Sequence, residues 1–386
     1  MLSSADYIVI GVYLAAVITF GLKAAGKQTS TKDYFLGGKQ LPWWAICFSI
    51  VATETSTLTV IGVPAVAYGG TLTFFQLTFG YLAGRVLVAI ILLPRYWEGE
   101  LSTAYELLGR RFGSRLRRIS SATFLLTRLL ADGVRLFATA IPIRIIALAA
   151  GYDIGYPVII ITIAVATAIY TYVGGLKAVV WMDVVQMSVY LFGAVITIIL
   201  AVGLVPDGAF RELSAAGKLQ TFDFTMDPIA WLTSPYAFVT ALVGGAVFSM
   251  ASHGTDQLIV QRLLACRSLA DARKAIVGSA VFIMIQFALF LAVGAVLWMY
   301  YGGADLTELG LGRADEVFPM FVVEQLPAGL AGLVLAGIVA AAMSTLSSSL
   351  NALASSSVWD IWPERLENAD DARRLAVSRA LTLFWT

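Results

Sequence analysis

The 386-residue chain contains few charged residues, two cysteines and one histidine, and each scarcity excludes a class of protein. Charged residues form 13% of the chain and hydrophobic residues 59%, whereas about a quarter of the residues of a soluble domain are charged. This composition excludes an ordinary soluble domain. The formal net charge is only +1, and the basic residues are spread over several loops, so no nucleic-acid-binding surface is expected.

The scarcity of cysteine and histidine also limits the chemistry that the chain can perform. Cys47 lies in an apolar segment and Cys266 in a basic loop, a distribution that indicates neither a disulfide framework nor a cysteine metal site. A serine hydrolase needs a histidine base beside its nucleophile, yet His253 is the single histidine and the motif G-x-S-x-G is absent. We therefore expect that the protein is not an enzyme.

Long apolar segments are the dominant feature of the sequence, whose mean hydropathy is +0.82. A helix needs about 20 mostly apolar residues to cross the hydrocarbon core of a bilayer. The sequence therefore predicts an all-α polytopic membrane protein in contact with lipid, with a further segment beginning near residue 375. The predicted segments are 7–25, 42–68, 71–93, 119–150, 155–173, 178–205, 233–252, 275–300 and 318–357.

The positive charges predict the orientation of these segments. Lys23 and Lys27 follow the first apolar segment and Asp6 precedes it, so this segment is typical of a retained helix and not of a signal peptide. With the N-terminus outside, the outer loops contain only Arg211, Lys218 and Arg313, as the positive-inside rule requires. We expect a protein of the plasma membrane, specifically the bacterial inner membrane, with its N-terminus outside.

Two of the apolar segments contain features that interrupt helices. The second segment, LPWWAICFSIVATETSTLTVIGVPAVAYGG, has a polar run at Thr53–Thr57, and the seventh has Gly244–Gly245 at its middle. Breaks five segments apart are typical of transporters built from inverted repeats, which bind their substrates at paired broken helices. The alternative is that glycine and proline are simply common in membrane helices.

The ninth segment ends in AAAMSTLSSSLNALASSS, residues 340–357, which is rich in hydroxyl side chains. On a helix, one face carries Ala341, Ser344, Thr345 and Ser348, and Ser347 flanks it. Such small residues often serve only close helix packing. Hydroxyl and freed carbonyl oxygens are also suitable ligands for a hard cation, and Asp183 at the inner start of the sixth segment could supply a carboxylate.

Charged residues within the membrane are costly and usually face a partner or a cavity. Glu54 lies in the break of the second segment, and the fourth segment carries Arg128, Asp132 and Arg135 at helical spacing. These three residues could form an ion triplet within their own helix. Alternatively, Arg135 could face the binding site and hold a substrate carboxylate in a bidentate pair.

Six segments occur in order along the chain: YFLGGKQLPWW, SIVATETSTLTVIGVPAVAYGG, GVRLF, GGLKAVVWMDVVQ, GTDQLIVQRLLACRS and AAAMSTLSSSLNALASSSVWDIW. With these segments the chain resembles the sodium/solute symporter family. The resemblance implies the inverted-repeat fold of the bacterial leucine transporter with one extra N-terminal helix. It implies one transmembrane transporter domain over 1–386, with a leading helix 7–25, a first five-helix repeat 42–205 and an incomplete second repeat 233–386. The sequence stops early in the ninth core helix of that fold, so we expect a chain truncated at its C-terminus.

The resemblance also implies which residues bind sodium ions. The main sodium site would use the carbonyl oxygens of Ala52, Thr55 and Ala341 and the hydroxyls of Ser344 and Thr345. A second sodium site, present in some members, would use an aspartate and hydroxyls that match Asp183, Ser344, Ser347 and Ser348.

The same resemblance implies substrate-contacting positions. Arg135 lies near the position at which the sialic acid transporter's arginine meets the substrate carboxylate, and Glu54 matches an aspartate of the proline transporter. The sugar transporters' Glu-Gln pair falls on Leu58–Thr59, which argues against a sugar. The expected substrate-binding residues are Glu54, Ser56, Thr59, Gln76, Arg135 and Phe248.

The resulting hypothesis is a sodium-coupled symporter that imports a small carboxylate-bearing solute, such as an amino acid or an organic acid, by alternating access. One alternative is a membrane sensor domain of the same family that is joined to a downstream histidine kinase. The other alternative is a sugar or polyol symporter.

Overall fold

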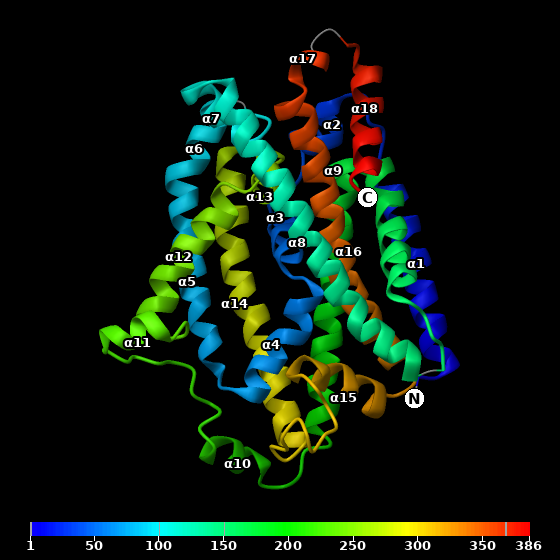
Figure 1. Ribbon diagram of the computed structural model, residues 1–386, viewed down its shortest axis with the longest axis vertical. Helices are drawn as coiled ribbons and strands as arrows, with labels where there is room; N and C mark the ends of the chain where they lie inside the picture. Colours follow the sequence, from blue (N-terminus) through cyan, green and yellow to red (C-terminus); the bar gives the residue numbers. More distant parts are fainter. Residues whose placement is uncertain (1, 100, 150, 367–368) are drawn as a thin grey trace.

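The computed structural model describes residues 2–99, 101–149, 151–366 and 369–386, and within them the chain is helical without a named strand. The longer helices run roughly along the long axis of the molecule (Figure 1). They are α1 Ser4–Ala24, α3 Trp43–Glu54, α4 Thr57–Gly69, α5 Leu77–Leu87, α8 Ser114–Ala149, α9 Tyr156–Val202, α12 Phe238–Gly254, α14 Leu269–Tyr300, α16 Leu330–Ser356 and α18 Asp371–Phe384. The shorter helices are α2 Thr31–Leu36, α6 Leu93–Glu98, α7 Ala104–Phe112, α10 Ala209–Ala215, α11 Pro228–Thr233, α13 Gln257–Leu264, α15 Val317–Gln325 and α17 Pro363–Leu366.

Six helical stretches of the described residues are long and apolar enough to cross a membrane, and the bent pair of α3 and α4 would make a seventh. Helix α8 is not among them, although the sequence predicts a span there, because it carries Arg128, Asp132, Arg135 and Arg144. These spans confirm an integral membrane protein.

The 47-residue helix α9 contains both the fifth and the sixth predicted segments. Its backbone leaves helical geometry at Gly175, where φ is 54° and ψ is −153°. A Cβ atom at this position would lie 2.3 Å from the carbonyl oxygen of Tyr34. Glycine is therefore required both by the positive φ and by this close approach, and it separates the two segments as the sequence predicts.

Helix α16, which carries the hydroxyl-rich stretch, lies in the interior of the bundle. Every residue from Ala340 to Ser356 is buried. Because neither water nor lipid reaches these hydroxyl groups, each needs a partner within the protein or a bound ligand. This placement makes the face of α16 a candidate for binding as well as for packing.

The predicted break at Gly244–Gly245 is wrong, because α12 runs through these residues without interruption. Helix α12 instead packs against α5 at this point: a Cβ atom on Gly80 would lie 2.4 Å from the carbonyl oxygen of Ala241. The helix stops at Gly254, and Asp256 caps the next helix, α13, by accepting a hydrogen bond from the N–H of Leu258. The interruption therefore lies about ten residues later than predicted, at Thr255–Asp256.

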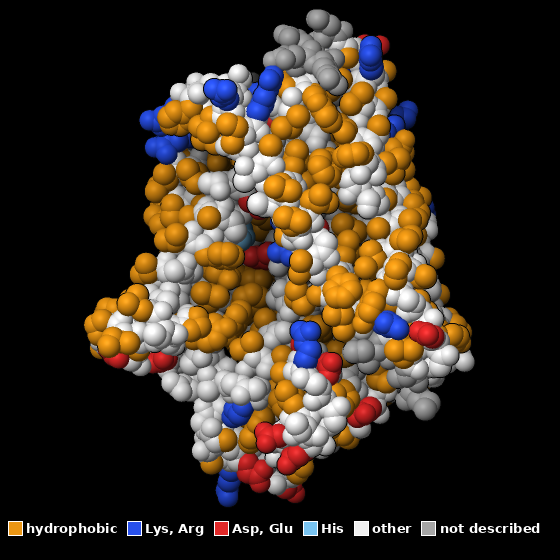
Figure 2. Space-filling view, in the orientation of Figure 1, with side chains coloured by type: hydrophobic (Ala, Val, Ile, Leu, Met, Phe, Trp, Pro, Cys, Tyr) orange, Lys and Arg blue, Asp and Glu red, His pale blue; other side chains and the backbone are white. Residues whose placement is uncertain are grey.

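The two ends of the molecule differ in charge on the face seen in Figure 2. Lys and Arg side chains gather around α7 at one end, whereas Asp and Glu side chains gather at the opposite end. This asymmetry is compatible with the predicted orientation, in which the basic end faces the cytoplasm.

Candidate functional site

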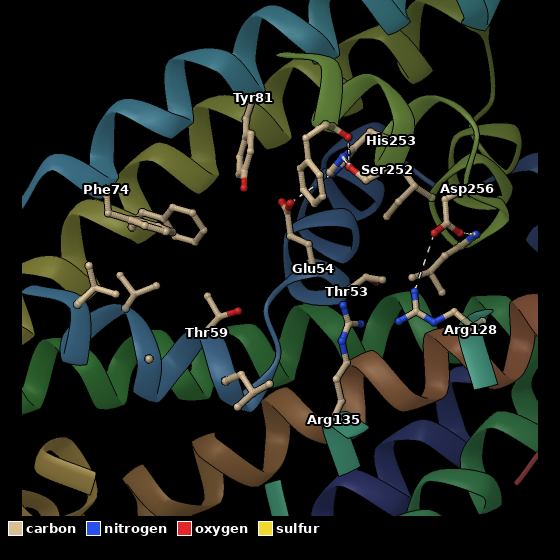
Figure 3. A pocket seen from close by; sticks show the side chains of 18 residues that line it. Thr53, Glu54, Thr59, Phe74, Tyr81, Arg128, Arg135, Ser252, His253 and Asp256 are labelled. Atoms are coloured by element: carbon tan, nitrogen blue, oxygen red, sulfur yellow. Dashed lines mark hydrogen bonds and ion pairs between the residues drawn. The ribbon is translucent and has the colours of Figure 1, made fainter. Parts of the chain in front are cut away.

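A cleft of about 600 Å³ lies beside the junction of α3 and α4 (Figure 3). Its walls come from the α3–α4 junction, the segment from Phe74 to Tyr81, helix α8, and the end of α12 with the start of α13. Its polar and aromatic lining includes Thr53, Glu54, Thr59, Phe74, Tyr81, Arg128, Arg135, Phe248, Ser252, His253 and Asp256. A cleft of this size is suitable for a small organic molecule.

The junction between α3 and α4 is the break that the polar run Thr53–Thr57 predicts. Helix α3 ends at Glu54, Thr55 and Ser56 have extended backbone, and α4 begins at Thr57 with an axis bent by 69°. Among the described residues, no backbone N–H donates to the carbonyl oxygens of Ala52 and Thr55. Carbonyl oxygens left free inside a membrane protein are available to a bound ion.

The hydroxyl face of α16 packs against this junction. The Thr345 hydroxyl donates to the carbonyl oxygens of Thr53, at 3.3 Å, and of Ala341, at 3.2 Å. The hydroxyls of Thr53 and Ser348 lie 3.0 Å apart. The structure thus brings the end of α3 and the hydroxyls of α16 together, although they are almost 300 positions apart in the chain.

A second polar cluster surrounds Asp183, which is completely buried. The Ser344 hydroxyl donates to one carboxylate oxygen at 2.6 Å, and the Ser49 hydroxyl donates to the other at 2.5 Å. The guanidinium group of Arg262, also completely buried, lies 3.2 Å from the same carboxylate and donates to the Ser348 hydroxyl. The Ser347 hydroxyl instead donates to the carbonyl oxygen of Ser344 at 3.0 Å.

Glu54 is paired with two residues for which the sequence predicts no role. One guanidinium nitrogen of Arg85 donates to both carboxylate oxygens, at 2.8 and 2.6 Å. The Nε2 atom of His253 lies 3.2 Å from the same carboxylate. The one signal in the sequence is that Arg85 is the single charged residue inside the third apolar segment. Because Arg85 neutralises Glu54, this wall of the cleft has little net charge.

The structure distinguishes the two alternatives for the charges of α8. Arg128 hydrogen-bonds Asp132 at 2.8 and 3.1 Å and lies 4.0 Å from Asp256. Arg135 takes part in no ion pair among the residues that the structure describes, and it is directed toward Thr53 and Glu54 (Figure 3). Asp132 is therefore occupied by Arg128, and Arg135 is free to bind a ligand.

Asp256, in the loop between α12 and α13, lies in the wall of the cleft and outside the spans. Burial raises the pKa of Asp256 above its usual value, and the nearby Arg128 opposes this increase. Its carboxylate also caps α13, so this side chain connects the wall of the cleft to the start of that helix.

Most of the expected substrate positions line the cleft, but two do not. Glu54, Thr59, Arg135 and Phe248 lie in its wall, whereas Ser56 lines a smaller cavity beside Arg135 and Thr345. Gln76 is completely buried and does not line the cleft.

The amide of Gln76 is already used by the fold. Its Nε2 atom donates to the carbonyl oxygens of Tyr236, at 2.7 Å, and Thr73, at 3.3 Å, and its Oε1 atom accepts from the N–H of Asp223. Gln76 therefore fixes the neighbouring loop. The sequence predicts no role for several other residues that line the cleft: Phe74, Tyr81, Ser252, His253 and Asp256.

The donor atoms near α16 fit an alkali cation better than a transition metal. The described residues contain no group of three or more His, Cys, Asp or Glu side chains that could hold a metal ion. The donors are instead neutral hydroxyl and carbonyl oxygens with one carboxylate nearby, a set suited to a hard cation of low charge.

Comparisons with known proteins find relatives of this chain. A model of the sodium:solute symporter family matches residues 34–385. The sodium/sialic acid symporter NanT of Aliivibrio fischeri is 30% identical over 379 residues, which cover 98% of this chain and 74% of that protein. The human sodium/iodide cotransporter is 31% identical over 391 residues, and the match covers 98% of this chain and 59% of the cotransporter.

A solved structure gives the same result for the fold. The substrate-bound, outward-open state of a sodium-coupled sialic acid symporter superposes with a TM-score of 0.86 at 28% identity. The superposition covers 99% of this chain and 80% of that symporter.

Proposed function

The chain belongs to the sodium:solute symporter family, and from this membership and the site described above we propose that it imports a small carboxylate-bearing solute with sodium. It is a sodium-coupled transport protein and not an enzyme, like the symporters that it matches. The solute class, the residues that bind it and the direction of transport belong to the proposal.

The observation that carries the choice of solute is the unpaired guanidinium of Arg135. Arginine and acidic side chains line the cleft, but Glu54 is neutralised by Arg85, and Arg128 is paired with Asp132 and lies 4.0 Å from Asp256. Among the described residues that line the cleft, Arg135 is the one arginine without an ion-pair partner. A guanidinium group binds a carboxylate in a planar bidentate geometry. NanT and the sodium/iodide cotransporter carry names of anionic solutes, which supports the same choice.

The proposed sodium ligands lie next to this carboxylate site. They are the carbonyl oxygens of Ala52, Thr55 and Ala341 with the hydroxyls of Ser344 and Thr345, and a second set is formed by Asp183, Ser344, Ser347 and Ser348. Thr345 and Arg135 line the same small cavity, so a proposed sodium ligand and the proposed carboxylate ligand lie close to each other. Sodium bound between α3 and α16 would fix the α3–α4 junction in the shape that the solute binds, and each ligand would then raise the affinity for the other.

The test is uptake into proteoliposomes that contain the purified full chain and carry an inward sodium gradient. Radiolabelled amino acids and organic acids are compared with the neutral amides of the same compounds. We expect sodium-dependent uptake of a carboxylate and not of its amide. Equal uptake of the two compounds, or uptake that does not depend on sodium, would contradict the proposal.

A matched pair of variants tests the role of Arg135. Hydrogen bonds to charged groups contribute about 1.5–3 kcal/mol, so Arg135→Ala should weaken apparent solute affinity by about tenfold to a hundredfold. Arg144→Ala is the control, because Arg144 lies on the same helix but contacts Asp153 and Tyr156 away from the cleft. An equal loss of affinity in both variants would refute a specific role of Arg135.

A further inference from the structure

The Asp183 cluster contains a cation that belongs to the protein itself. Arg262 is completely buried on α13, and its guanidinium group reaches oxygens from three other helices. Its Nε atom donates to the Ser49 hydroxyl at 2.8 Å, and its Nη2 atom donates to Asp183 at 3.2 Å and to the Ser348 hydroxyl. Its Nη1 atom donates to the carbonyl oxygen of Leu258 at 2.7 Å.

These oxygens overlap the proposed second sodium site. Asp183 and Ser348 contact the guanidinium group directly, and Ser344 donates to the other oxygen of the same carboxylate. Asp183 is the one acid among these groups, so Arg262 alone makes the cluster electrically neutral. A sodium ion added to this arrangement would leave a buried net charge of +1, which a low-dielectric interior disfavours.

We propose that Arg262 is a tethered competitor of sodium: its guanidinium group holds Asp183 when sodium is absent and must withdraw from that carboxylate when sodium binds there. The inference rests on the proposed sodium-coupled function and adds to it a residue that sets the sodium affinity of the second site. Withdrawal exchanges one positive charge for another, so the cluster stays neutral in both states.

The position of Arg262 connects this exchange to the solute cleft. Asp256 caps the start of helix α13, and both Asp256 and Leu258 line the cleft. Leu258 is also the residue whose carbonyl oxygen accepts from Arg262. A movement of the guanidinium group away from Asp183 therefore acts on the short helix that forms the inner wall of the cleft.

The experiment measures thermal unfolding of the full chain in detergent, with sodium chloride varied against potassium chloride at constant ionic strength. A ligand that binds only the folded state raises the unfolding temperature by mass action. In Arg262→Gln, the competitor loses its charge and Asp183 lacks a cation. We expect the sodium concentration for half-maximal stabilisation to fall by about tenfold, within the usual range of coupling between sites. Arg262→Lys retains the charge and should keep a sodium dependence close to that of the wild type.

Two further variants locate the effect. Asp183→Asn combined with Arg262→Gln removes the carboxylate for which the cations compete, and it should abolish the gain in sodium affinity. Ser49→Ala removes one anchor of the guanidinium group, and it should lower the half-maximal sodium concentration by a smaller factor. Ser49→Ala also decides the question if Arg262→Gln does not fold in any salt.

The possible results separate this inference from the proposed function. If the wild-type protein shows no stabilisation by sodium, the proposed sodium coupling fails. If sodium stabilises the wild type but neither Arg262→Gln nor Ser49→Ala lowers the half-maximal concentration, Arg262 is a structural partner of Asp183 and the competition is refuted. A gain that persists in the double variant also refutes it.

Discussion

Arg85 of α5 and Glu54 at the end of α3 form an ion pair beside the cleft, with 2.6 Å between a guanidinium nitrogen and a carboxylate oxygen. The side chain of Arg85 is completely buried, and that of Glu54 is 18% exposed. This pair removes the negative charge that Glu54 would otherwise present to the cleft. It also connects the α3–α4 junction to α5, so the position of the broken helix depends on a contact between distant parts of the chain.

The ion pair predicts a large loss of stability when one partner is removed. Glu54→Gln leaves a buried guanidinium without its counter-ion, which costs about 3–5 kcal/mol, and Arg85→Gln should have a similar effect. Thermal unfolding in detergent measures the change. The double variant should lose less stability than the sum of the two single variants, because the residues contact each other.

Asp315→Asn is the control for this measurement. Asp315 also pairs with an arginine, Arg313, but the side chain of Arg313 is 61% exposed. An exposed pair contributes at most about 1 kcal/mol, so we expect a small change in unfolding temperature. Additive single and double variants of Glu54 and Arg85 would show that the pair does not act as one unit.

The hydroxyl groups of α16 predict an effect on sodium binding. Ser344→Ala removes a proposed ligand of both sodium sites, and we expect the sodium concentration for half-maximal stabilisation to rise by about tenfold, as for the loss of one good interaction. Titration of the unfolding temperature with sodium measures it. Ser188→Ala provides the matched change, because Ser188 is exposed and its hydroxyl donates only to the carbonyl oxygen of Val184. Unchanged sodium dependence in Ser344→Ala would indicate that this hydroxyl serves packing alone.

The contact between α5 and α12 predicts that two glycines differ sharply in tolerance to substitution. A Cβ atom on Gly80 would lie 2.4 Å from a backbone oxygen of α12, whereas a Cβ atom on Gly244 would meet nothing within 4 Å. Gly80→Ala should therefore destabilise the protein by about 1–3 kcal/mol, and Gly244→Ala should have no such cost. Unfolding temperatures of the two variants test this. Equal tolerance at both positions would contradict the close packing of these helices.

The proposed orientation predicts which engineered cysteines react from outside the cell. Glu308→Cys should react with a membrane-impermeant thiol reagent on intact cells, and Arg111→Cys should react only after permeabilisation. Both positions are exposed at opposite ends of the molecule. The native background should be low, because Cys47 and Cys266 are buried and burial raises the pKa of the Cys266 thiol. The reverse labelling pattern would reverse the predicted orientation.

The sequence by itself determined that the chain is a helical membrane protein, where the break between α3 and α4 lies and which face of α16 carries hydroxyl groups. Each of these depends on local properties: apolar length, a polar run that cannot continue a lipid-facing helix, and the helical spacing of Ser344, Thr345 and Ser348. The position of Arg135 inside an apolar segment left two alternatives open, an ion triplet within its own helix and a role in binding. These signals need no information about which helices are neighbours.

Only the tertiary structure decided which charges are paired and which glycines permit close packing. Gly245 predicted a break and Gln76 a substrate contact, yet the first packs against α5 and the second holds a loop. Arg85 with Glu54 and Arg262 with Asp183 join residues that are 31 and 79 positions apart. A charge or a glycine in a membrane helix indicates that something lies opposite, but its identity depends on the packing of the helices, which no local pattern specifies.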